Sequence, residues 1–77
     1  MTAPGSLRGA ALSDGRTVMK AAVDVDGELR GYTPVHVGGL EAGPHQVRVV
    51  GERRSSSTRV LIRSGETARV LVELPPP

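Results

Sequence analysis

The sequence predicts an all-β fold, a small antiparallel β-sandwich of five to seven short strands. Short apolar runs alternate with polar residues with a period of two, which is typical of half-buried strands. Turn residues interrupt these runs at intervals of about 8–12 residues, as expected of an antiparallel sheet. No segment shows a helical period of useful length, and 77 residues suffice for one small domain.

The composition divides the chain into three parts. Residues 1–16 are rich in Gly, Ala, Ser and Pro and show no clear period, which predicts a leader or linker segment. Residues 17–74 carry the alternating pattern and are predicted to form the β-sandwich domain. Residues 75–77 are prolines, which predict a polyproline-type tail.

The first predicted hairpin lies in the stretch VDVDGELRGYTP. Val23 and Val25 alternate with acidic residues, so they predict a strand with one apolar face. Asp26-Gly27 is a strong signal for a tight turn, because both residues tolerate the positive φ angles of a type I′ turn. Residues 28–32 are then predicted to form the returning strand.

A Thr-Pro pair ends this hairpin. Pro34 lacks a backbone donor and favours an extended conformation at Thr33. A short strand is predicted at 35–37, and the connection 38–45 has one large apolar residue, Leu40, which is expected to fill the core.

Three further strands are predicted in the second half of the chain. HQVRVV at 45–50 places valines on one face, and GERRSSS at 51–57 is typical of a polar hairpin loop. TRVLIR at 58–63 and TARVLVEL at 67–74 are the last two strands, with a Ser-Gly turn between them.

The order of these motifs resembles the PEGA domain family over about residues 18–74. The resemblance rests on a V-D-G strand end, a G-x-T-P element, a Leu and a G-x-H-x-V strand, which occur in that order. The matching residues are Val25, Asp26, Gly27, Gly31, Thr33, Pro34, Leu40, Gly43, His45, Val47 and Val49. The last hairpin of the family is similar to IRSGETARVLVEL.

The resemblance implies a β-sandwich without enzymatic activity, found in bacterial surface proteins or beside Ser/Thr kinases. It implies no ligand. Its turn residues are expected to have structural roles, and they are Asp26, Gly27, Gly31, Thr33, Pro34, Gly43 and His45. Two departures stand out: Glu41-Ala42-Gly43-Pro44 replaces the signature turn, and Glu52, not an aromatic residue, follows Gly51.

The acidic and imidazole side chains are candidates for a metal site. Asp24, Asp26 and Glu28 are hard-oxygen ligands of the kind that Ca²⁺ prefers, but the spacing does not fit an EF-hand loop. His36 and His45 lack a partner at ligand spacing. The simpler interpretation is a solvated strand, a turn and a structural His45, so we expect no metal, no cofactor and no catalytic residue.

Arginine accounts for nine of the ten basic residues, and the net charge is +2. Residues 46–77 hold six arginines against three acids. The preference for arginine over lysine is typical of anion recognition, although a GC-rich genome explains it as well. A candidate contact surface consists of Arg48, Arg53, Arg54, Arg59, Leu61, Arg63 and Leu71. Nucleic acid is a poor fit, because Tyr32 is the only aromatic residue available for stacking.

These features favour a non-catalytic interaction or spacer module of a bacterial envelope or signalling protein. The expected partner is a protein or an acidic envelope polymer. The alternative is a self-assembling subunit that forms oligomers or filaments through its edge strands.

The sequence has no cysteine, its first residues lack the apolar run that a signal peptide requires, and no apolar run is long enough to span a membrane. The expected location is the cell envelope or surface, within a larger exported or membrane-anchored protein. It is the cytoplasm if residue 1 is the natural start.

Overall fold

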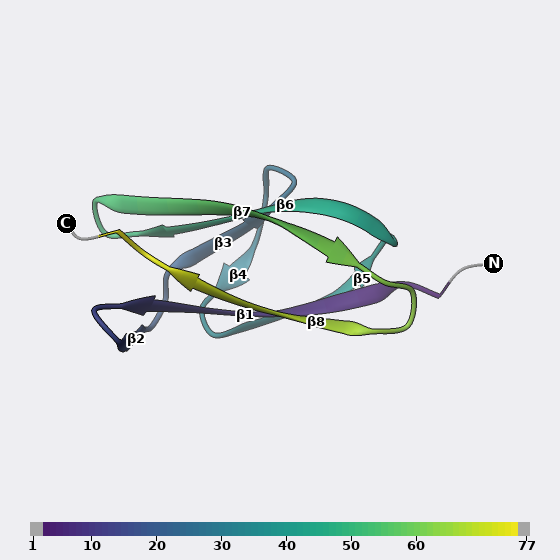
Figure 1. Ribbon diagram of the computed structural model, residues 1–77. Coiled ribbons are helices and arrows are strands. Elements are labelled where there is room, and N and C mark those ends of the chain that lie inside the picture. The colour runs from purple at the N-terminus through teal and green to yellow at the C-terminus, as the bar shows by residue number, and fades with distance from the viewer. Residues whose placement is uncertain (1–2, 76–77) are drawn as a thin grey trace.

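The computed structural model describes residues 3–75 and consists of two four-stranded sheets packed face to face (Figure 1). This arrangement confirms the predicted all-β sandwich, with eight strands in place of five to seven. The strands are β1 (Gly5–Ser13), β2 (Arg16–Val18), β3 (Ala22–Val25), β4 (Glu28–Tyr32), β5 (Val35–Leu40), β6 (Gly43–Gly51), β7 (Arg54–Ile62) and β8 (Thr67–Glu73).

Sheet A is built around β1. Along one edge β1 pairs with β8 in parallel, so that Leu7 lies opposite Ala68. Along its other edge it pairs antiparallel with β5 through residues 5–9 and with β2 through residues 11–13. Among the described residues, β2, β5 and β8 pair with no strand other than β1. This sheet therefore depends on β1 for its continuity.

The prediction that residues 1–16 form a leader or linker is wrong for the part that the structure describes. Leu7 and Ala11 are fully buried in the core. A Cβ atom at Gly5 would collide with the side chain of Ile62 and the carbonyl oxygen of Arg63, so the small residue serves close packing. Residues 1–2 of the predicted leader and residues 76–77 of the proline tail lie outside the described residues.

Sheet B is antiparallel throughout, with the strand order β4-β3-β6-β7. The β3–β4 hairpin and the long β6–β7 hairpin are local pairings, and β3 joins them by pairing with β6. In register, Val23 lies opposite Val49, and Val25 lies opposite Val47. These valines all point toward sheet A, because side chains on one face recur at every second residue.

The core between the sheets is aliphatic. The buried apolar side chains are Leu7, Ala11, Ala21, Val23, Val25, Val37, Leu40, Val47, Val49, Ile62, Val70, Val72 and Leu74. Leu40 fills the core as the sequence predicted. The described residues include no helix that could span a membrane.

Candidate functional site

A polar clasp ties the β3–β4 turn to β6. Asp26 and Gly27 form the turn with φ angles of 52° and 84°. One carboxylate oxygen of Asp26 accepts a hydrogen bond from the Gln46 backbone N–H at 2.9 Å. The other lies 2.5 Å from Nδ1 of His45, while Nε2 of His45 lies 2.6 Å from the Glu41 carbonyl oxygen. Both ring nitrogens therefore face acceptors, which favours the doubly protonated imidazolium.

The electrostatics of the clasp agree with this geometry. The hydrogen bond to the Glu41 carbonyl oxygen raises the pKa of His45, and the Asp26 carboxylate raises it further. The hydrogen bond from the Gln46 backbone lowers the pKa of Asp26, and His45 adds to the effect. The pair thus holds its charges over an intermediate range of pH, and its geometry is that of a turn support.

A second polar contact, centred on Thr33, joins two of the crossovers between the sheets, the β2–β3 and the β4–β5 connections. Thr33 is 2% exposed; its Oγ1 donates to the Val18 carbonyl at 2.8 Å and accepts from the Ala21 backbone N–H at 3.0 Å. The following Thr33-Pro34 peptide bond is cis. The hydroxyl satisfies two backbone groups that the crossing chain would otherwise leave unpaired.

Gly31 and Gly43 occupy strained positions. Gly31 has a φ of 149°, and a Cβ atom there would lie 2.9 Å from a methyl of Val35. Gly43 begins β6 with a φ of 131°. Neither residue carries chemistry, and both let the backbone reach geometry that a side chain would oppose.

The carboxylates of Asp24, Asp26 and Glu28 do not converge with other ligands. Asp24 lies opposite Arg48 on sheet B, Asp26 belongs to the clasp, and Glu28 is exposed on the edge strand β4. Within residues 3–75, no group of three His, Asp or Glu side chains is arranged to hold a metal ion. His36 lies on the outer face of sheet A.

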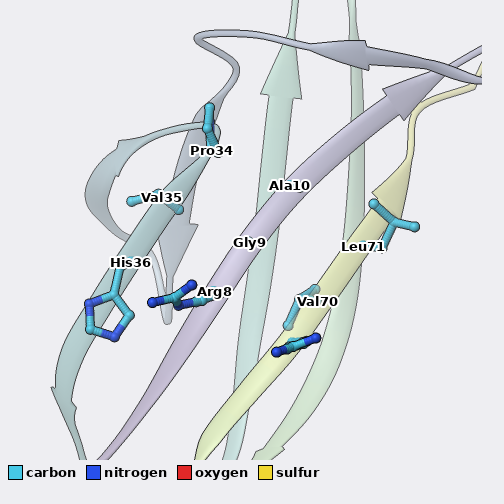
Figure 2. Close-up of a pocket in the computed structure, with 9 residues that line it drawn as sticks. Arg8, Gly9, Ala10, Pro34, Val35, His36, Val70 and Leu71 are labelled. Carbon is cyan, nitrogen blue, oxygen red and sulfur yellow. The ribbon is translucent and has the colours of Figure 1, made fainter.

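A groove with a volume of about 490 Å³ lies on the outer face of sheet A (Figure 2). β1 and β8 contribute three consecutive residues each, and the third side consists of Pro34 and the first two residues of β5. The lining residues are Arg8, Gly9, Ala10, Pro34, Val35, His36, Arg69, Val70 and Leu71. Figure 2 shows Arg8 and His36 near one another at one end of the groove, and Leu71 across β1 from Pro34. The lining combines an apolar floor with cationic side chains.

The predicted contact surface is corrected by the fold, because its residues do not share one face. Arg48, Arg59 and Leu61 project from the outer face of sheet B, where Arg59 lies opposite Gln46. Arg54 is half-buried and donates to the Ser13 hydroxyl and the Pro75 carbonyl oxygen. Leu71 lies on sheet A and is separated from Leu61 by the β7–β8 crossover.

The two remaining arginines of that set lie in connections. Arg53 occupies the β6–β7 turn with a φ of 61°, and Arg63 follows the end of β7. The sequence prediction omitted Arg8, Ala10 and Arg69 from the contact residues. These residues come together only through the pairing register of β1 and β8, which cannot be deduced from their spacing in the sequence.

The fold and the polar contacts define a class, a two-sheet β-sandwich module whose hydrogen-bonded side chains brace turns and crossovers. A family model for the PEGA domain matches residues 17–77. The chain belongs to the PEGA domain family. A comparison with curated proteins finds no match.

The boundary of the family match has a structural consequence. The matched segment begins within β2 and leaves out β1, the strand with which β2, β5 and β8 all pair. In this chain the folded unit therefore extends from Gly5 to Leu74, beyond the segment that the family model covers.

Proposed function

We propose that this chain is a non-catalytic interaction module of a larger bacterial envelope or signalling protein. The groove on sheet A carries the proposal, because Leu71 is 65% exposed within it. An exposed large apolar side chain in a concave site is more typical of binding than of a solvated sheet face. The other hydrogen-bonded polar side chains have structural roles. Asp26 and His45 support the β3–β4 turn, and Thr33 supports the crossovers.

The proposal is tested by displaying short peptides of varied charge and hydropathy on an array and probing them with the labelled chain. Leu71→Asp, which places a charge in the groove, is expected to abolish binding. Leu61→Asp is the matched control, because Leu61 is 57% exposed on the opposite sheet. Loss of binding in both variants, or in neither, contradicts the groove as the binding surface.

Self-assembly is a second candidate function, favoured by the edges of the sandwich. Within the described residues, β7 and β8 each pair with one strand, so each has a free edge. Light scattering after size exclusion over a wide concentration range separates the two functions. A steady mass near 8.0 kDa supports the interaction module. A discrete oligomer, or filaments by negative-stain microscopy, supports assembly.

A further inference from the structure

A row of basic side chains crosses the outer face of sheet A. Arg8 lies directly opposite His36 on β5 and directly opposite Arg69 on β8. All three side chains are exposed, and neighbouring strands lie about 4.8 Å apart. Within residues 3–75, the structure records no ion pair for either arginine. This row forms one end of the groove.

The Arg8–Arg69 pair is unfavourable for the sheet itself. Like charges directly opposite one another destabilise a pair of strands. Stability therefore gives no reason for the arrangement, whereas a bound anion would relieve the repulsion. Two guanidinium groups side by side are well suited to a carboxylate, which accepts paired N–H bonds from the planar guanidinium.

The next two rows of the same face have a different character. Two residues along the strands, Ala10 lies opposite Leu71. Pro34, which immediately precedes β5, also lines the groove. Two residues further, Leu12 lies opposite Glu73. Successive rows of side chains on this face are therefore cationic, apolar and acidic, and they lie about 6.6 Å apart.

This spacing fits an extended peptide. In an extended chain, side chains on one face recur every two residues, also at about 6.6 Å. An acidic residue at the first position would meet Arg8 and Arg69, and an apolar residue two positions on would cover Leu71. A basic residue after two more would meet Glu73.

A second copy of the chain fits the face less well. If two copies packed face to face in opposite directions, the cationic row of each copy would lie on the acidic row of the other. Two arginines would then face a single Glu73. Three strands of seven residues offer roughly 300 Å², against about 800 Å² per partner in a stable complex. Two concave faces would also enclose a void, which close packing disfavours.

We propose that the groove of sheet A binds an extended segment of another protein in which an acidic residue and an apolar residue lie two positions apart. This inference rests on the interaction function proposed above and specifies its partner. The acidic side chain is held by Arg8 and Arg69, and the apolar one lies on Ala10 and Leu71.

The test is an NMR titration of the full ¹⁵N-labelled chain with the capped peptide Ser-Glu-Ser-Leu-Ser-Lys-Ser, which carries no net charge. The amides of residues 8–10 and 69–71 are expected to shift. The peptide with Gln in place of Glu should bind at least about fivefold more weakly, because a charge-assisted hydrogen bond is roughly twice as strong as a neutral one. The peptide with Ser in place of Leu should also bind more weakly than the parent peptide.

A pair of variants separates recognition from folding. Arg8→Gln should weaken binding of the Glu peptide by a similar factor without lowering the melting temperature, since it removes a like-charge contact. Arg59→Gln is the control on sheet B and should leave binding unchanged.

Equal affinity for the Glu and Gln peptides, with shifts still in the groove, overturns this inference and leaves the interaction function standing. Absence of groove shifts with every peptide on the array overturns both. A rise in mass with concentration that Leu71→Asp abolishes assigns the groove to a second copy and also overturns the inference.

Discussion

Substitution of Leu7 by alanine tests whether β1 belongs to the folded core. Leu7 is fully buried between the sheets and lies opposite Val37 and Ala68. Removing a buried leucine side chain costs about 3–5 kcal/mol, because transfer energy and a cavity both contribute. A domain of 77 residues has a free energy of unfolding of about 4–12 kcal/mol. Leu7→Ala should therefore remove a quarter or more of the stability.

The assay is urea denaturation followed by far-ultraviolet circular dichroism, with the midpoint and slope compared between variants. The expected loss corresponds to a fall in melting temperature of at least about 12 °C for a domain of this size. Leu71→Ala makes the same chemical change on the exposed face of the neighbouring strand and should stay within about 0.5 kcal/mol of the parent. If Leu7→Ala behaves like Leu71→Ala, the reasoning about β1 is refuted.

The remaining predictions concern the clasp, the crossover and the first strand. The stabilisation from His45 is fully present below its ordinary pKa of 6.5 and is lost as pH rises through its raised folded pKa. The stabilisation from Asp26 is present above 3.8 and is lost as pH falls through its lowered folded pKa. The melting temperature should therefore fall as pH rises through the folded pKa of His45. If a His45→Gln variant showed the same fall, the pH dependence could not be assigned to His45. Thr33→Val leaves two backbone groups unpaired and should cost about 2–3 kcal/mol by urea denaturation. Thr67→Val, which removes an exposed hydroxyl pair, should cost almost nothing, and equal losses would argue against the crossover contact. Gly5→Val should destabilise the chain measurably, because its side chain would collide with the end of β7; an unchanged melting temperature would contradict that packing.

Local signals were sufficient to predict much of sheet B. Asp26-Gly27 specifies its turn chemically, and alternating valines specify which faces of β3 and β6 are buried. The role of His45 in supporting a turn also agrees with the prediction, because its ring bridges Asp26 and the Glu41 carbonyl. These features depend on residues close in sequence or on one strongly patterned strand.

The place of β1 was not predicted, for a physical reason. The buried face of β1 consists of Gly5, Leu7, Gly9 and Ala11. The small residues allow close packing, but they also give the segment a composition typical of a linker. The alternation is present, but glycine and alanine carry little β-propensity. Its partner β8 lies about 60 residues away and pairs in parallel, so no hairpin signal links the two.

The candidate binding surface was mispredicted because sequence proximity was read as spatial proximity. Leu61 and Leu71 are near in sequence and were predicted to share one surface, yet the β7–β8 connection places them on opposite sheets. Arg8 and Arg69 are distant in sequence but directly opposite one another in register. Only the pairing of β1 with β8 brings the groove together.

Hydrogen–deuterium exchange of the intact chain tests most directly the claim on which both the fold and the groove rest, that residues 5–13 form the central strand of sheet A. The amides of β1 are expected to be protected as strongly as those of β6, because both strands are paired along two edges. Exchange of the β1 amides at the rate of an unfolded peptide, with sheet B still protected, would contradict the claim and remove the groove with it.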